Sequence, residues 1–238
     1  MSHDTPAALH LETVGDRRYR VENHGDATVN NVVFGGQLLA QMITVAAAQD
    51  HDQHVKTINA VFARAARVDA QTEIAVECIH AGRTFASYTI TAWQGERLCA
   101  RSLVLTTIDE PDLIEHRPQM PSVPTPDVAG ALRDGMLVFP GAEYLIVGDI
   151  DVNDASLPSR PAQLDMWYRS EGTPDDRTID QAALAWATDG FLIGTAMLPH
   201  AGVGQEQAHV SLSTGVVDHT LTFHRPFSLR DWVLLSHE

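Results

Sequence analysis

The hydrophobic positions between Val33 and Gln49 recur with the period of an α-helix. After Gly35 and Gly36, apolar side chains follow the i, i+3, i+4, i+7 spacing of a helix that is buried on one face. These side chains are Leu38, Leu39, Met42, Val45 and Ala46. Alanine has a high helix propensity, and residues 46–48 are all alanine. We therefore predict a buried hydrophobic helix, followed by a polar break over 50–54.

Alternating apolar and polar positions predict strands after this helix, over residues 55–64, 72–80, 84–94 and 97–107. Turn residues around Gly82 and Gly95 separate the later strands. An earlier alternating piece at 9–21 is compatible with a strand pair or an edge strand, and residues 1–8 with a loose tail. A helix followed by antiparallel strands predicts an α+β fold with the helix against one sheet.

The pattern changes at residue 109, where proline and acidic residues become frequent. Such composition is typical of a linker. The prolines are Pro111, Pro118, Pro121, Pro124 and Pro126. Residues 127–161 are poorly patterned, apart from an apolar stretch at 144–147, and we assign no elements to most of them.

The second half of the chain repeats the order of the first. A strand at 164–169, a polar turn with helix-capping residues at 173–176 and a helix at 179–186 are followed by strands at 210–223, with a break near Gly215, and 231–236. Residues 58–64 have a counterpart in 219–225. The sequence therefore predicts two copies of one structural unit.

The repeat predicts that the second unit lacks about two strands, because two further strands follow 72–80 in the first unit and the sequence ends at Glu238 in the second. A truncated chain, completion by a partner and an open sheet edge each explain this. The open edge is the least favourable physically, because unpaired edge groups promote aggregation.

The composition is that of a globular protein, with 44% hydrophobic and 20% charged residues. The net charge of −15 argues against a nucleic-acid partner and against an anionic membrane surface. Lys56 is the sole lysine in the sequence, so an anionic ligand would meet arginine or backbone donors. The candidate side chains are Arg64, Arg67, Arg83 and Arg225.

Cysteine usage predicts a reduced, cytoplasmic protein, because Cys78 and Cys99 form neither a CxxC motif nor a disulfide framework. The sequence has no apolar run long enough to cross a membrane, and residues 1–5 lack the features of a signal peptide.

Several kinds of chemistry are disfavoured. The sequence contains no GxSxG, G-x-G-x-x-G or Walker motif, and neither cysteine has a neighbouring cation that would activate it. His51 and His54 have a spacing compatible with a metal, but their polar surroundings favour a solvated loop. We predict no metal and no cofactor.

Asp189 is the leading candidate for catalysis, because it is an acid within an otherwise apolar stretch. A buried carboxylate is costly unless it is hydrogen-bonded or functional. A polar residue that ends a helix is the equally weighted alternative. Thr214 and Asp218 share one face of the predicted strand if Gly215 introduces no bulge. An Asp from the helix that faces a hydroxyl from this neighbouring strand could hold and deprotonate a water.

Gly35 and Gly36 are candidates for substrate binding. Glycines at a helix N-terminus allow a carbonyl oxygen or an oxyanion to approach the free N–H groups. The alternative is that these glycines only relieve crowding where the helix meets the sheet.

Together these segments resemble the type II acyl-CoA thioesterase family, which has a tandem hot dog fold. The resemblance rests on Val33-Phe34-Gly35-Gly36-Gln37, Gly82-Arg83-Thr84-Phe85-Ala86, Ala187-Thr188-Asp189, Asp218-His219-Thr220 and Phe223-His224-Arg225-Pro226-Phe227. It implies two units, each a long helix wrapped by a curved antiparallel β-sheet. We expect an N-terminal unit at 1–110, a connection at 111–161 and an incomplete C-terminal unit at 162–238.

The resemblance implies hydrolysis of fatty acyl-CoA to free fatty acid and CoA by a water that an Asp, a Thr and a Gln hold. The Asp corresponds to Asp189, and the Thr position is occupied by Val216. The Gln belongs to a last strand that the sequence does not contain, and Thr214 could supply the missing hydroxyl. Gly35, Gly36 and Gln37 are the expected substrate-binding residues, and a homo-oligomer is the expected assembly.

Two alternatives remain at this point. One is a catalytically impaired acyl-CoA-binding protein of the same fold, which Val216 and the missing strands favour. The other is a hot dog dehydratase or hydratase, disfavoured because no histidine follows Asp189 within five residues.

Overall fold

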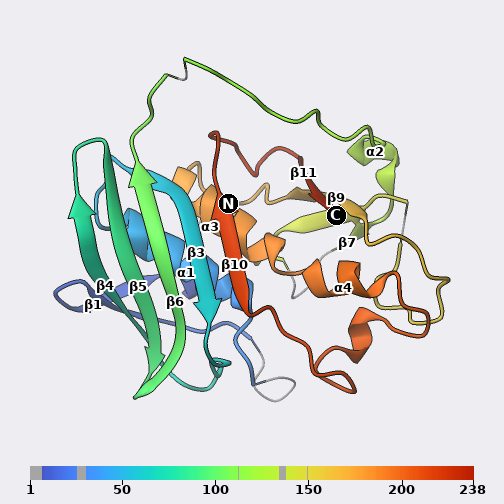
Figure 1. The fold of residues 1–238 in the computed structure, drawn as a ribbon, viewed down its shortest axis with the longest axis horizontal. Coiled ribbons are helices and arrows are strands. Elements are labelled where there is room, and N and C mark those ends of the chain that lie inside the picture. Colours follow the sequence, from blue (N-terminus) through green and yellow to red (C-terminus); the bar gives the residue numbers. More distant parts are fainter. Residues whose placement is uncertain (1–6, 26–30, 112, 134–137, 149) are drawn as a thin grey trace.

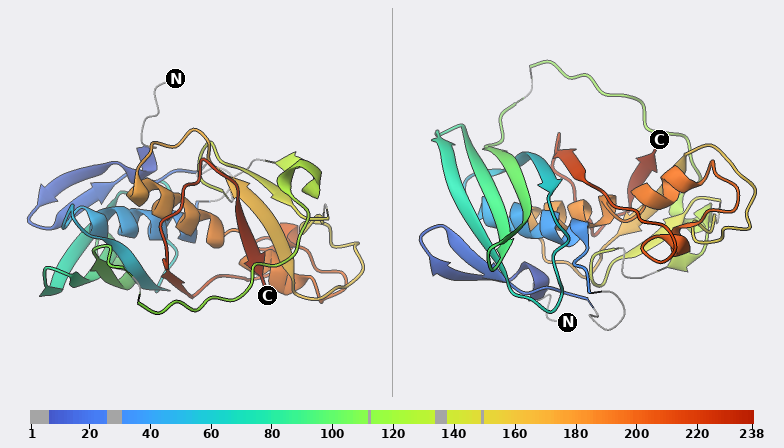
Figure 2. Two further views of the ribbon diagram at one scale, coloured as in Figure 1. Left: turned by 90° about the horizontal axis from the view of Figure 1, so that it is seen from above. Right: turned by 60° about the horizontal axis from the view of Figure 1, so that its bottom comes forward.

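Two helices occupy the centre of the molecule, α1 (Gly35–Ala47) and α3 (Arg177–Thr188), and they pack against each other (Figure 1). The computed structural model describes residues 7–25, 31–111, 113–133, 138–148 and 150–238. The structure has a larger and a smaller β-sheet. The smaller sheet lies with helix α4 (Leu192–Met197), and the two sheets are at opposite ends of the molecule (Figure 2). The central helices therefore form the junction between the two halves.

The predicted first helix is confirmed, with its end at Ala47. The side chains that set its period are buried, including Leu39 and Met42. Gly36 lies so close to α3 that an added Cβ atom would be 2.4 Å from the carbonyl oxygen of Trp186. The close approach of the two helices therefore depends on a glycine at this position.

The larger sheet is antiparallel and wraps α1 in the order β1-β2-β4-β5-β6-β3-β10. Its inward-facing positions alternate along the strands, as with Ile58 and Ala60, and join the core around α1. The strands are β1 (Leu11–Gly15), β2 (Arg18–Val21), β3 (His54–Phe62), β4 (Thr72–Ala81), β5 (Phe85–Gln94), β6 (Arg97–Thr107) and β10 (Asp218–Thr222). The predicted strand pair near the N-terminus is thus present, and part of the predicted tail, residues 1–6, lies outside the described residues.

The smaller sheet has the order β11-β9-β8-β7. Its strands are β7 (Leu132–Arg133), β8 (Glu143–Ile146), β9 (Leu164–Arg169) and β11 (Val233–His237). The region that the sequence left unassigned therefore supplies β7, β8 and the short helix α2 (Pro126–Ala129). In addition, α4 (Leu192–Met197) and the 3₁₀ helices η1 (Ala7–Leu9) and η2 (Gln205–Gln207) are present.

The second predicted helix is confirmed and begins at Arg177, because Asp176 caps it. The Asp176 carboxylate accepts hydrogen bonds from the backbone N–H groups of Thr178 and Ile179 at 2.7 and 3.1 Å. Tyr168 on β9 donates its buried hydroxyl to the carbonyl of Ala183, at 3.1 Å. The cap fixes where α3 begins, and the tyrosine holds α3 against the smaller sheet.

The repeated strands lie side by side, because β3 pairs with β10 in antiparallel register. Asn59 is opposite Thr220, which is its own counterpart in the repeat, and its side-chain amide donates to the threonine hydroxyl at 2.6 Å. The two copies therefore meet about a local pseudo-twofold axis at this pair.

The predicted strand over 210–223 is wrong in its first part, since β10 begins only at Asp218. The partner strand β3 ends at Phe62, whose N–H bonds to the carbonyl of Val217. Residues before Val217 would extend past the end of β3 and have no ladder to join. Val210 is 84% exposed, so the alternation there does not reflect a buried face.

The predicted linker is extended. Its described residues between 109 and 125 contain no helix or strand and cross the molecule as a strap from β6 to α2 (Figure 1). Arg177 holds the beginning of this strap to α3 through Asp109, with an N–O distance of 2.8 Å. No helix in the described part of the chain is both long and apolar enough to cross a membrane.

The two halves differ in how their strands close around the helices. Strands β5 and β6 separate β4 from β3 in the larger sheet. Within the described residues, β11 and β10 are edge strands of different sheets, with no such pair between them.

Candidate active site

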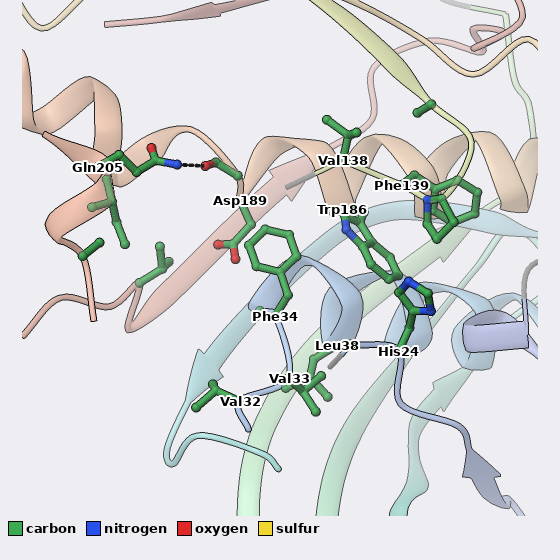
Figure 3. Close-up of a pocket in the computed structure, with 18 of the residues that line it drawn as sticks. His24, Val32, Val33, Phe34, Leu38, Val138, Phe139, Trp186, Asp189 and Gln205 are labelled. Carbon is green, nitrogen blue, oxygen red and sulfur yellow. Dashed lines mark hydrogen bonds between the residues drawn. The ribbon is translucent and has the colours of Figure 1, made fainter. Parts of the chain in front are cut away.

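A cavity of about 1780 Å³ opens where the two halves meet (Figure 3). Its lining comes from the N-terminus of α1, the end of β3, the C-terminus of α3 and the segments around residues 138–143 and 205–216. The volume exceeds the roughly 300–1,000 Å³ of ordinary ligand pockets. The cavity is therefore large enough for an extended ligand.

One wall of this cavity is aromatic. The ring of Trp186 lies 6.2 Å from that of Phe34 and 5.6 Å, edge-on, from that of Phe139, measured between centroids. Val33, Leu38 and Val138 extend the apolar lining beside them (Figure 3). This wall suits a hydrocarbon chain.

Asp189 lies at the end of α3, where it is the C-cap residue, and its side chain faces the cavity near Phe34 (Figure 3). The residue is only 6% exposed. One carboxylate oxygen, Oδ1, is 3.2 Å from Nδ1 of His219. The other, Oδ2, lies against Gly35, where an added Cβ atom would be 2.6 Å from it.

His219 is a residue of the site that was not predicted from the sequence. It lies on β10, is 8% exposed, and its Nε2 atom is 3.3 Å from the Thr188 hydroxyl. A dehydratase was disfavoured because no histidine follows Asp189 closely in the sequence, but this reason does not hold in the structure, since β10 brings His219 to Asp189. A period-two pattern starting at Asp218 would have pointed to His219 as the inward-facing residue.

Of the three predicted substrate-binding residues, one lines the cavity and two do not. Gly35 lines the cavity at the first turn of α1, and the N-cap residue Phe34 makes no side-chain cap hydrogen bond there. The first N–H groups of this helix lack intrahelical partners and carry partial positive charge. Gly36 instead faces α3. Gln37 is fully buried, does not line the cavity, and accepts a hydrogen bond from the N–H of His24 at 3.1 Å.

Thr214 lines the same cavity as Asp189, from a loop and not from a strand. The predicted shared face with Asp218 is wrong, because Asp218 is exposed on β10. The Thr214 hydroxyl is buried and has no hydrogen-bond partner among the described residues. Val216 also lines the cavity.

Gln205 is a further polar residue in the lining that the sequence did not reveal. Its side-chain amide donates to the carbonyl of Gly190 at 3.4 Å, next to Asp189 (Figure 3). The contact joins η2 to the end of α3.

Of the four arginines predicted to meet an anionic ligand, one lines the cavity. Arg64 lines the cavity, whereas Arg67 pairs with Asp69 at 2.7 Å and Arg225 pairs with Glu115. Asp69 raises the pKa of the Arg67 guanidinium through this hydrogen bond. Arg83 is exposed and does not line the cavity.

The two cysteines do not line the cavity. Burial raises the pKa of the Cys99 thiol, which makes it a poor nucleophile. Among the described residues, no group of three or more His, Cys, Asp or Glu side chains is placed to hold a metal ion.

Comparison with known families identifies both halves of the chain. Residues 23–107 match the acyl-CoA thioesterase N-terminal domain, and residues 159–238 match the acyl-CoA thioesterase family. The "Acyl-CoA thioesterase 2" of Haemophilus influenzae is 30% identical over 97% of this chain and 84% of its own length. The mouse "Acyl-coenzyme A thioesterase 8" is 27% identical over 98% of this chain and 78% of its own length. The chain belongs to the type II acyl-CoA thioesterase family.

Solved structures confirm the tandem hot dog fold. The tesB protein of Mycobacterium avium subs paratuberculosis superposes with a TM-score of 0.78 at 22% identity, covering 97% of this chain and 83% of that one. An acyl-CoA thioesterase II from Mycobacterium marinum superposes with a TM-score of 0.76 at 24% identity, covering 97% and 82%.

Proposed function

We propose that this protein hydrolyses fatty acyl-CoA thioesters to free fatty acid and CoA. Membership of the acyl-CoA thioesterase family supports this activity. The structural observation that carries the proposal is a buried carboxylate, Asp189, at the end of an apolar cavity and beside the N-terminus of α1.

In the proposed reaction the acyl chain lies along the wall formed by Phe34, Phe139 and Trp186. The thioester carbonyl oxygen points to the first N–H groups of α1, which stabilise the negative charge that develops on it. Asp189 accepts a proton from a water molecule while the water oxygen attacks the carbonyl carbon. The C–S bond then breaks, and the departing CoA thiolate takes up the proton.

Arg64 is the side chain that we propose for the CoA phosphates. It lines the cavity and is exposed in a protein whose net charge is −15. Arginine recognises phosphate oxygens through paired N–H donors. A local cation here would offset the repulsion between an acidic protein and a polyanionic substrate.

An acyl-CoA-binding protein without turnover is the alternative, and nothing in the comparisons favours it. Acyl-CoA would stabilise the fold thermally whether the protein is a thioesterase or only a binding protein, by an amount that depends on ligand concentration. Release of CoA thiol over time separates them, because it requires the thioester bond to break.

Asp189→Asn tests the role of the carboxylate. Positioned general bases contribute about 10²–10⁴-fold to rate, so we expect kcat to fall by roughly this range while acyl-CoA still stabilises the fold. The measurement is CoA release, followed with a thiol reagent over a series of acyl chain lengths. Asp218→Asn is the matched control, since it removes the same charge from an exposed position on β10. An Asp189→Asn rate within twofold of the wild-type rate would falsify the assignment.

We also infer that the protein is a homo-oligomer and acts in the cytoplasm. The edge positions of β10 and β11 support assembly, because natural sheets seldom leave edges uncovered. The free thiols of Cys78 and Cys99 support a reducing compartment.

A further inference from the structure

The two oxygens of the Asp189 carboxylate have different surroundings. Oδ1 contacts His219 from β10, whereas Oδ2 lies against Gly35 at the start of α1. A carboxylate held by one oxygen keeps the other oriented. The partner of Oδ1 therefore decides where Oδ2 points.

We propose that His219 is a positioning residue for the thioester hydrolysis proposed above, on which this inference rests. His219 donates its Nδ1–H to Oδ1 of Asp189 and so holds Oδ2 at the N-terminus of α1, where the water is deprotonated. It does so without touching the substrate, since His219 is not among the residues that line the cavity.

The direction of the hydrogen bond follows from the groups involved. An ionised carboxylate only accepts, so a contact of 3.2 Å between Nδ1 and Oδ1 requires the proton on Nδ1. The other ring nitrogen, Nε2, is 3.3 Å from the hydroxyl of Thr188, the residue next to Asp189. Both ring nitrogens thus lie against the C-terminal end of α3.

The position of the ring is also fixed from the other side. His219 pairs with Ala60 in the ladder between β10 and β3, and the residue is 8% exposed. Asp189 is 6% exposed. Water has little room to replace the imidazole, so losing it would leave the buried carboxylate short of a partner and free to turn.

Two substitutions distinguish a positioning role of His219 from a role in packing alone. His219→Ala removes the donor, and a misplacement of about 1 Å at a reacting group costs roughly a hundredfold in rate. We expect kcat to fall by about that factor, with KM changed less than about threefold. His219→Asn restores an N–H near the place of Nδ1 and should recover most of the rate. Imidazole added to His219→Ala should also restore part of it.

His224→Ala is the matched control, because it removes an imidazole from an exposed position just after β10. Unchanged kcat in His219→Ala would overturn the inference, as would equal losses in His219→Ala and His219→Asn at wild-type Tm. If His219→Ala does not fold, nitrogen NMR of the wild-type imidazole decides: an Nδ1 without a proton would overturn it. A wild-type protein that releases no CoA would instead defeat the proposed function.

Discussion

At the residue scale, Thr214 and Asp189 present the clearest contrast in the cavity. Asp189 has a side-chain partner, whereas the Thr214 hydroxyl is buried with none in the described part of the chain. An unsatisfied buried hydroxyl costs about 1–3 kcal/mol. Because Thr214 lines the cavity, we infer that the attacking water or the substrate becomes the partner of this hydroxyl once a ligand binds, although the oxygen is covered in the structure.

Thr214→Val tests this inference, since valine has nearly the same shape without the hydroxyl. We expect Tm to stay the same or rise, because no protein hydrogen bond is lost, and kcat to fall roughly tenfold, or about 1.4 kcal/mol in the barrier. Steady-state kinetics and a thermal melt measure the two effects. Ser213→Ala, at the exposed neighbouring position, serves as the control. A lower Tm with unchanged kcat would assign Thr214 to packing.

The same scale shows what the sequence could predict of the site. Asp189 was detectable, because an acid inside an apolar stretch needs an explanation. The contact of Asp189 with His219 was not, because the two residues are 30 apart in the sequence and meet only through the pairing of β10 with β3. Gln37 illustrates the opposite case: it is adjacent to the two glycines, but it does not line the cavity and its side chain accepts a hydrogen bond from the backbone of His24.

At the element scale, two glycines at the N-terminus of α1 each contact a different part of the C-terminal end of α3. Gly35 faces the side chain of Asp189, and Gly36 faces the backbone of Trp186. Flexible side chains can move aside, whereas the backbone of a packed helix cannot do so without moving the helix. Adjacent residues in one helix therefore have separable roles.

We expect Gly36→Ala to lower the stability of the protein and Gly35→Ala to lower kcat. An alanine at 36 would lie 2.4 Å from the Trp186 oxygen and 2.9 Å from its Cα atom, so α1 and α3 must separate. Overpacking of this kind costs about 1–3 kcal/mol of stability. An alanine at 35 would displace the Asp189 carboxylate instead, so we expect near-normal stability and a large loss of kcat. Urea unfolding and CoA release measure the pair, and equal stabilities would contradict the distinction.

The helices were predictable because their burial is set by local spacing, as at Leu38 and Met42. The segment from Val210 to Val217 was not, because alternation predicts a strand whether or not a partner strand is present. Its ladder with β3 stops at the Phe62–Val217 hydrogen bond, and the preceding residues form a loop over the cavity. The length of β3 thus decides where β10 begins.

At the scale of the whole molecule, Asp180 connects the central helix to the C-terminal segment. Its carboxylate is buried in α3 and accepts a hydrogen bond from the N–H of Leu229 at 3.1 Å. Burial raises the pKa of Asp180 above its usual range, and the Leu229 N–H offsets this only in part. The native state therefore binds this proton more tightly than the unfolded chain does.

The raised pKa of Asp180 makes the folding stability fall as pH rises. Stability from a raised carboxyl pKa is fully present below the unfolded value of about 4 and is lost as pH rises through the folded value. Asp180→Asn keeps an oxygen acceptor for Leu229 and avoids the buried charge. We expect its Tm to exceed that of the wild type at pH 7, with a difference that shrinks toward pH 4. Melts across this range measure it, and a difference independent of pH would refute the explanation.

The facing of Asn59 and Thr220 across the β3–β10 ladder has an evolutionary meaning. A strand that pairs antiparallel with its own counterpart makes the same contacts whether the two belong to one polypeptide or to two identical ones. An ancestral homodimer of single units could therefore be joined by gene fusion without redesign of its seam. Once joined, each half would be free to diverge, and in this chain one half carries Asp189 whereas the other presents Gly35 to it.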